Sequence, residues 1–401
     1  MRPASPEERR LLRDTLHRFV RRELWQQEKR LESNAFALPA DVSATLSAKV
    51  ESMGLALLRE PEALGGPPLD GATRALLIEE LSQHRAGVLA PGYGLFGPEV
   101  PPALYGATPE QQQRFLLPLL RGQRRCFTAL HEPWADAAQD GIRIRARRTA
   151  EGWMLDGTKL FVAGAGPNAG GADFGVVHAR AESETGEPLG AVRLLVETTR
   201  VGFQRWRPYP TLAVGRDTQE LNLSNLRLPA ENQLASNDAA TAAHTRHDIF
   251  VAAQLAGVGR AALAIMRARL RSAPIGGSAE ADRWALADCD VALSAASAFT
   301  QAVAISAPWA AQEASDEDTD ATRAPAAPWG AEQVAGARLA VQDAAGRAVD
   351  AAITAMGPAG VSTDLPLERW WRELRVMRES DGGPARLRAA TADRLLTDFG
   401  P

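Results

Sequence analysis

The sequence predicts an α+β protein in which a helical region, a β region and a second helical region follow one another. Apolar residues recur at helical spacing in the first third, strand-like alternation begins near Cys126, and long alanine-rich helical patterns return from about residue 237. A chain of 401 residues, 45% of them hydrophobic, can bury more than one core. We therefore expect three domains, at residues 1–124, 125–236 and 237–401.

Helix start signals mark the first region. Ser5-Pro6-Glu7-Glu8 is a capping box with proline at the first helical position, and apolar residues from Leu12 to Leu24 then share one helical face. Helical patterns continue over residues 41–54 and 71–84, and a further capped helix begins at Thr108. The first region is therefore predicted to be mostly α.

The middle region shows the period of two that is typical of strands. Residues Ile142 to Arg147 alternate strictly, and Trp153 to Val162 predicts a strand, an Asp-Gly turn and a second strand. Further strands are expected over Phe174 to His178, Ala191 to Val196 and Glu220 to Leu226. Their spacing favours a small β-sandwich or barrel domain.

The last region contains helical patterns over Phe250 to Leu270, Ala281 to Ala304 and Ala331 to Met356. Residues 307–330 are acidic and proline-rich, and we expect them to form an exposed, mobile loop between helices.

A basic amphipathic helix near the C-terminus then leads to Asp381 and two glycines. Taken alone, Asp before Gly-Gly is ordinary turn chemistry. Trp370 and Trp371 are expected to pack in the core.

Bulk properties exclude several classes of function. The net charge is −4, so no basic excess indicates nucleic acid or an anionic membrane as a partner. The two cysteines are far apart and the six histidines do not cluster, which argues against a metal site and suits a reducing compartment. We see no signal peptide and no apolar run long enough to span a bilayer, so we expect a cytoplasmic protein.

Ordered motifs along the whole chain resemble the acyl-CoA dehydrogenase superfamily. They are Tyr105 to Gly122, Leu130-His-Glu-Pro133, Gly157-Thr-Lys-Leu-Phe-Val-Ala163, Glu220 to Asn232, Gly357-Pro-Ala-Gly-Val361 and Arg369 to Gly382. The resemblance implies an N-terminal helical domain, a central β-sandwich or barrel domain and a C-terminal helical bundle.

The resemblance also implies a reaction, the α,β-desaturation of an acyl thioester. Asp381 stands where the family usually has a catalytic Glu, and one branch of the superfamily resembles this chain in using Asp. Asp381 would remove the Cα proton, and FAD would accept the hydride from Cβ. The substrate would be an acyl-CoA or an acyl-carrier-protein thioester. Glu379 is an alternative base, because in an extended segment it would share the face of Asp381.

Carried over position by position, the resemblance assigns FAD contacts to Leu130, His131, Phe161, Ala163, Met356, Gly357 and Gly383, and substrate contacts to Arg246, His247 and Gly382. Several of these depart from the family pattern, since hydroxyl residues are replaced at 131, 163 and 383 and a Phe-Gly pair is missing after Arg271. Either main-chain groups hold FAD instead, or the chain binds FAD poorly or not at all. For Arg246 and His247, a phosphate contact and a solvated helix start are both open.

Three functions therefore remain open. The first is an FAD-dependent acyl-CoA dehydrogenase. The second is a flavin-free enzyme of the same fold that uses Asp381 for proton transfer or elimination. The third is a non-catalytic subunit that pairs with an active homologue. In each case we expect a homo-oligomer, or a hetero-oligomer with a homologue.

Overall fold

The computed structural model describes residues 4–133, 141–166, 171–272, 278–306, 330–380 and 383–397. Asp381, Gly382 and residues 307–329 of the expected loop therefore lie outside the described residues. The chain forms two compact units. The first comprises Met1–Gly97, Thr245–Glu379 and Pro384–Pro401, and the second comprises Pro98–His244 with Ser380–Gly383. The first unit thus joins helices from both ends of the chain, and the division into three domains stays a prediction.

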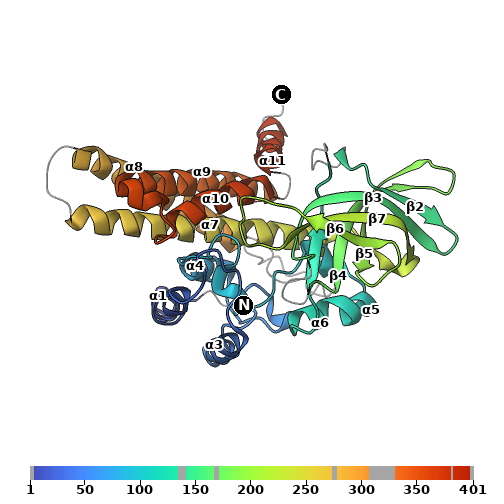
Figure 1. Cartoon of the computed structure of the whole chain (residues 1–401), viewed down its shortest axis with the longest axis horizontal. Coiled ribbons are helices and arrows are strands. Elements are labelled where there is room, and N and C mark those ends of the chain that lie inside the picture. The colour runs from blue at the N-terminus through green and yellow to red at the C-terminus, as the bar shows by residue number, and fades with distance from the viewer. Residues whose placement is uncertain are drawn as a thin grey trace, which may run out of the picture. The chain divides into compact units, whose positions relative to one another are not determined.

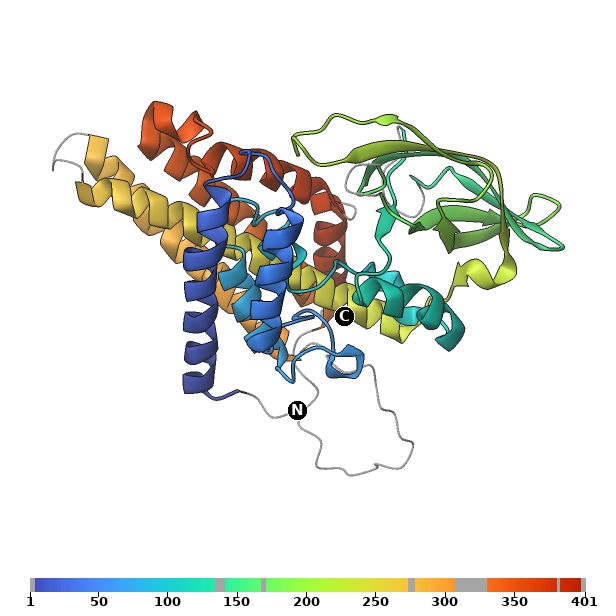
Figure 2. The ribbon, with the colours of Figure 1, turned by 60° about the horizontal axis from the view of Figure 1, so that its bottom comes forward.

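The first unit is helical. Its first helix begins as the sequence predicts, because the Ser5 side chain accepts from the Glu8 amide and the Glu8 side chain accepts from the Ser5 amide. Figures 1 and 2 both show the long helices α7, α8 and α9 running alongside one another. Its main elements are α1 (Pro6–Phe19), η1 (Val20–Leu24), α2 (Trp25–Glu28), α3 (Ala40–Ser52), η2 (Glu62–Leu64), α4 (Gly71–Leu81), η3 (Pro91–Gly94), α7 (Asp238–Ser272), α8 (Ser278–Ser306), α9 (Ala331–Met356), η9 (Gly357–Val361), α10 (Leu367–Glu379) and α11 (Gly383–Thr397).

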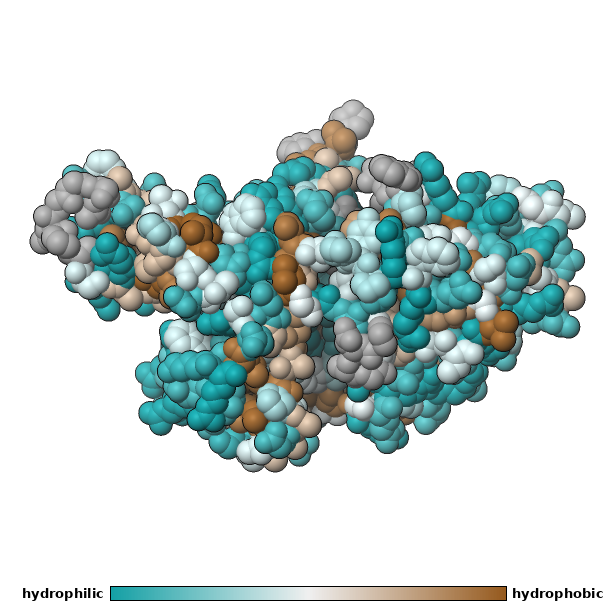
Figure 3. Space-filling view, in the orientation of Figure 1, coloured by the Kyte–Doolittle hydropathy of each residue, from teal (hydrophilic) through white to brown (hydrophobic). Residues whose placement is uncertain are grey.

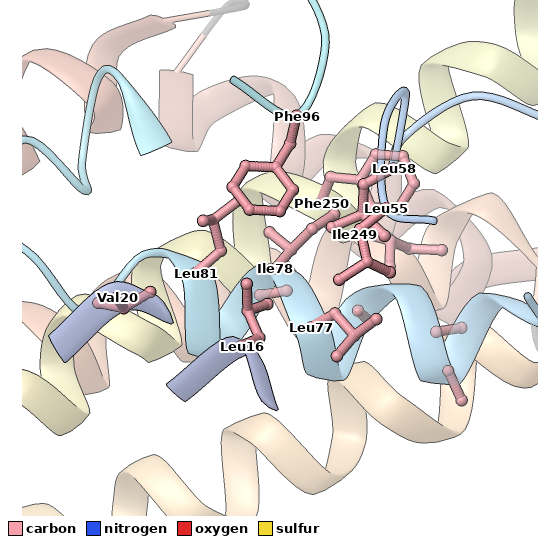
Figure 4. Close-up of a cluster of buried hydrophobic side chains, with 14 of the residues drawn as sticks. Leu16, Val20, Leu55, Leu58, Leu77, Ile78, Leu81, Phe96, Ile249 and Phe250 are labelled. Atoms are coloured by element: carbon pink, nitrogen blue, oxygen red, sulfur yellow. The ribbon is translucent and has the colours of Figure 1, made fainter. Parts of the chain in front are cut away.

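The core of this unit joins α1, α4 and α7. Figure 4 shows Leu16 and Val20 facing Leu77, Ile78 and Leu81, with Ile249 and Phe250 closing the cluster from α7; the same core includes Leu46, Leu55, Leu58 and Phe96. Gly257 lets α7 approach α4 closely, since a Cβ there would lie 2.0 Å from the Glu79 carbonyl oxygen.

Helix α7 is long and apolar enough to cross a membrane by length and composition alone, with a mean hydropathy of 1.8 over its best window. The sequence pattern alone predicts no apolar run of that length. In the structure 83% of the window is buried against the rest of the protein, which is the environment of a core helix. The surface in Figure 3 is largely hydrophilic, and apolar side chains appear on it in small separate groups, which is normal for a folded protein.

The second unit contains an eight-stranded mixed sheet in the order β6-β7-β3-β2-β4-β5-β8, with β1 also paired to β4. Strands β1 and β2 pair with β4 in parallel, at Cys126↔Phe174 and at Arg145↔Arg180, while β3, β5 and β7 pair antiparallel with their neighbours. The α+β class is thereby confirmed. The strands are β1 (Cys126–Ala129), β2 (Arg145–Thr149), β3 (Gly152–Ala163), β4 (Phe174–Glu182), β5 (Pro188–Glu197), β6 (Phe203–Pro208), β7 (Thr218–Pro229) and β8 (Gln233–Leu234), and the short helices are η4 (Pro102–Gly106), α5 (Pro109–Gln111), η5 (Gln112–Leu116), α6 (Leu117–Leu120) and η8 (Ala230–Asn232).

The predicted hairpin turn at Asp156-Gly157 was wrong. Strand β3 runs unbroken from Gly152 to Ala163, and its register against β7 shifts between Leu155 and Gly157. Gly157 has φ +142°, and a Cβ there would lie 2.7 Å from the Ile144 side chain. Strand β7 pairs with β3 on both sides of Gly157, so this glycine produces a bulge rather than a chain reversal.

The expected core position of Trp371 was also wrong. Trp370 is fully buried, and its indole N–H lies 3.2 Å from the carbonyl oxygen of His84 and 3.0 Å from that of Arg85. Trp371 is 39% exposed. Consecutive residues of a helix point about 100° apart, so both rings cannot enter the same core.

Candidate functional site

Four of the predicted FAD-contact residues come together in the second unit. Leu130 and His131 follow the end of β1, and Phe161 and Ala163 lie at the end of β3. The Leu160 amide donates to the His131 carbonyl oxygen at 2.9 Å. The rings of His131 and Phe161 lie edge to face with centroids 6.1 Å apart. Two segments separated by about thirty residues thus form one surface.

Phe161 occupies a special backbone position on this surface. Its φ is +56°, which is rare for a residue with a side chain, and the register of β3 shifts again between Lys159 and Val162. At this bulge Phe161 is 47% exposed. Strain of this kind persists only where the surroundings hold it, and it is common at ligand sites.

Tyr209 supports the Phe161 ring from a segment that no sequence motif marks. The ring centroids of Tyr209 and Phe161 are 4.7 Å apart and the ring planes are inclined at 71°. The Tyr209 amide donates to the Thr218 carbonyl oxygen at 2.8 Å. Tyr209 directly follows β6, an edge strand that was not predicted because most of its residues are exposed and no apolar alternation marks it. Tyr209 lies far along the chain from both His131 and Phe161, so no local pattern marks its role.

A buried ion pair underlies this surface. The Lys159 ammonium is fully buried and lies 2.6 Å from Glu132 Oε1, and it also donates to the Leu130 carbonyl oxygen at 2.9 Å. Glu132 Oε2 accepts from the amides of Arg143 and Ile144 at 2.7 and 3.0 Å. Burial lowers the pKa of Lys159, and the contact with Glu132 opposes that shift. The pair therefore fixes the backbone at Leu130 against β3.

The surface fits a flavin ring through flat apolar contacts better than through side-chain hydrogen bonds. Phe161 offers an exposed aromatic face, and the partly exposed Ala163 offers only a methyl group. His131 is the polar side chain among the four. Backbone groups at the end of β3 and after β1 are the other polar atoms that could meet an isoalloxazine ring. Within the residues described by the structure, no group of three acidic, histidine or cysteine side chains could hold a metal ion.

Four further predicted contacts, Arg246, His247, Met356 and Gly357, lie in the first unit. Arg246 is not at a solvated helix start, because α7 begins at Asp238 and Arg246 is only 5% exposed. Burial lowers the pKa of Arg74 to about 10, with a smaller lowering contribution from the charge of Arg246 and an opposing one from Glu60. Met356 ends α9, and Gly357 follows with φ +58° and an exposed backbone. His247 follows Arg246 on α7 and is partly exposed.

The segment around Asp381 has defined ends. Helix α10 ends at Glu379 and α11 begins at Gly383, whose φ is +64° and whose next residue is Pro384. A left-handed residue before a helix-starting proline favours glycine, which gives a local reason for the loss of the family threonine at 383. Glu379 is the last helical residue and is exposed, so the extended geometry that made it an alternative base is absent.

Comparison with known proteins covers both ends of the chain. The sequence model for the acyl-CoA dehydrogenase N-terminal domain matches residues 6–123, and the model for the C-terminal domain matches residues 239–396. The mitochondrial short-chain specific acyl-CoA dehydrogenase of Mus musculus is 25% identical over 407 aligned residues, which cover 98% of this chain and 91% of that protein. The mitochondrial long-chain specific enzyme of the same organism is 29% identical over 221 residues, 54% of this chain and 50% of that protein.

Solved structures share the fold at lower identity. Butyryl-CoA dehydrogenase from Megasphaera elsdenii aligns with a TM-score of 0.75 and 22% identity over 99% of this chain and 100% of that one. A glutaryl-CoA dehydrogenase from Mycobacterium smegmatis in complex with FADH2 aligns with a TM-score of 0.75 and 20% identity, over 98% of this chain and 95% of that one. Because the two domain models together span most of the residues and the relatives align from end to end, this chain belongs to the acyl-CoA dehydrogenase family.

Proposed function

We propose that this acyl-CoA dehydrogenase-like oxidoreductase desaturates an acyl thioester between Cα and Cβ, with Asp381 as the base that removes the Cα proton. The observation that carries the proposal is the place of Asp381 in the chain. It follows the end of α10 and precedes the left-handed Gly383, in the position that the family resemblance gives to the catalytic carboxylate. Ser380 and Gly383, on either side of it, belong to the unit that contains His131 and Phe161.

Different residues of this chain would transfer the proton, exclude water and position the site. Asp381 holds the abstracted proton on its carboxylate, and its backbone N–H donates to the thioester oxygen as charge develops there. Phe161, supported by Tyr209, covers an apolar face and excludes water. The Lys159–Glu132 pair keeps the backbone that carries His131 in place. Asp is one methylene shorter than Glu, so the substrate must approach the backbone closely, which Gly382 and Gly383 permit.

FAD fits this proposal as the group that would supply the hydride acceptor. Leu130, His131, Phe161, Ala163, Met356, Gly357 and Gly383 are the residues proposed to hold it. Because hydroxyl donors are replaced at 131, 163 and 383, we expect weaker binding than is usual in the family. Each neutral hydrogen bond contributes about 0.5–1.5 kcal/mol, so several losses amount to orders of magnitude in affinity.

The test of the base is the pair of variants Asp381→Asn and Glu379→Gln, assayed for acyl-thioester-dependent reduction of an acceptor dye in the presence of excess FAD. Asp381→Asn should lose at least about 100-fold in kcat, because general base catalysis contributes factors of that size. Glu379→Gln should retain activity. An active Asp381→Asn variant with correct folding would remove Asp381 from the mechanism.

The visible spectrum of the purified protein separates the alternatives. The proposal predicts pale protein that turns yellow with added FAD. A protein that ignores FAD but exchanges substrate α-protons in deuterated water, and loses that exchange in Asp381→Asn, would be a flavin-free proton-transfer enzyme. A protein that is inactive alone in both assays, but forms an active complex with a co-expressed homologue and keeps that activity in Asp381→Asn, would be a non-catalytic subunit.

The partners follow from the same proposal. We propose an acyl-CoA or an acyl-carrier-protein thioester as substrate, an oligomer of this chain or of this chain with a homologue, and a cytoplasmic location. Light scattering that gives a monomer mass at micromolar concentration would contradict the oligomer.

A further inference from the structure

A buried ionic cluster joins three helices of the first unit. Asp248 on α7 is 4% exposed, and its carboxylate forms an ion pair with Arg338 on α9. The same carboxylate accepts from the Arg386 guanidinium on α11, with Arg386 Nη2 at 3.1 Å from Oδ2 and 3.3 Å from Oδ1. One carboxylate thus connects segments almost 140 residues apart in sequence.

The two arginines hold Asp248 in different ways. The Arg338 side chain is 1% exposed, so this pair lies inside the helical core. The Arg386 side chain is 33% exposed, so its head reaches inward from the surface of α11. Hydrogen bonds between charged groups are stronger than neutral ones, and burial of the carboxylate reduces their screening by water. The loss of Arg386 alone would leave Asp248 paired with Arg338.

Arg386 lies in the first turn of α11. It follows Gly383 by three residues, and Gly383 and Pro384 fix the direction in which that helix begins. The preceding helix has a weaker anchor near its end, since Arg378 and Asp343 form an exposed pair at 3.2 Å. Exposed pairs of that kind contribute little to rigidity. Of these two ion pairs, the contact of Arg386 with the buried Asp248 is therefore the stronger.

We infer that Asp248 is a positioning residue, which acts through Arg386 to fix the first turn of α11 and with it the C-terminal end of the short segment that carries Asp381. The inference rests on the proposed role of Asp381 as base. A base must lie within hydrogen-bond reach of the proton that it removes, and misplacement by about 1 Å can cost about 100-fold in rate. An anchor at Arg386 would therefore affect turnover more than substrate binding.

The test compares Arg386→Met with Arg386→Lys and with Arg388→Met. Lys keeps a charge that can reach Asp248, and the exposed Arg388 on the same helix provides the matched control. Amide hydrogen exchange of residues 385–392 should be about tenfold faster in Arg386→Met, because local opening of α11 loses a charge-assisted bond. Arg386→Lys and Arg388→Met should stay close to wild type.

Steady-state kinetics provide the second measurement. In Arg386→Met, kcat should fall about 10- to 100-fold while KM changes by less than about threefold, and Arg386→Lys should recover much of kcat. Equal exchange rates in Arg386→Met and wild type overturn the anchor, and faster exchange with unchanged kcat overturns its positioning role. A wild type without turnover contradicts the proposed function instead, and hydrogen exchange still decides whether Asp248 anchors α11.

Discussion

The Glu132→Gln substitution provides the sharpest test of how the candidate FAD surface is held. It is nearly isosteric and removes one negative charge. In the wild type that charge lies 2.6 Å from the Lys159 ammonium, and both side chains are at least 96% buried. The variant leaves a buried ammonium with the Leu130 carbonyl oxygen at 2.9 Å and no opposing carboxylate from Glu132.

Breaking a buried ion pair from one side typically costs about 3–5 kcal/mol, because the remaining charge loses its compensation. Two backbone amides, those of Arg143 and Ile144, also lose an ionised acceptor. For a unit of about 150 residues, this cost corresponds to a fall of roughly 6–20 °C in the melting temperature. We expect that fall in the transition of the second unit.

The assay is thermal and urea unfolding followed by circular dichroism, at pH 7 and without FAD. The matched control is Glu132→Gln combined with Lys159→Met, which removes both charges and should recover most of the lost stability, since well-packed apolar replacements of buried pairs are often neutral. A Glu132→Gln variant within about 1 kcal/mol of wild type would refute the reasoning, because that is the range of an exposed pair.

Three further predictions concern the same two units. The pKa of Lys159 in the folded state lies below its ordinary value of 10.5. Between these two pKa values the unfolded chain binds more protons than the folded protein, so the free energy of unfolding should rise with pH. Urea midpoints measured toward pH 10.5 should show this rise, and the double variant Lys159→Met, Glu132→Gln should not. Gly157→Ala should destabilise the sheet by about 1–3 kcal/mol in urea unfolding, because the new Cβ combines a positive φ with a contact of 2.7 Å to Ile144. Gly257→Ala should cost about 3 kcal/mol or more in the helical unit, because its Cβ would meet the Glu79 carbonyl oxygen at 2.0 Å and separate α7 from α4.

The glycine predictions have a control on α9. A Cβ added at Gly346 would meet no atom within 4 Å, and the residue is helical. Gly346→Ala should therefore stabilise the protein slightly, by about 0.5–1 kcal/mol, through helix propensity alone. A similar gain at Gly257 would show that α4 and α7 do not pack closely there.

The sequence by itself determined which segments form helices and strands wherever the signal is local. The capping box at Ser5 has the predicted hydrogen bonds, and α9 spans the predicted residues 331–356. Capping and periodicity depend on neighbours within one turn, so a single stretch of chain contains the information. The family resemblance likewise rests on ordered local motifs, and the comparisons confirm it.

The tertiary structure decided what each residue faces. Asp156-Gly157 could have been a hairpin turn, and it became a bulge because β7 pairs with β3 on both sides of it. Trp371 points to solvent although its neighbour is buried, and Tyr209 joins Phe161 from an unpredicted edge strand.

The contacts of Asp248 with Arg338 and Arg386 join three helices far apart in the chain, and no local pattern marks them. Such contacts form only when the core has placed the helices side by side. Their partners are therefore set by packing, and not by any property of the neighbouring sequence.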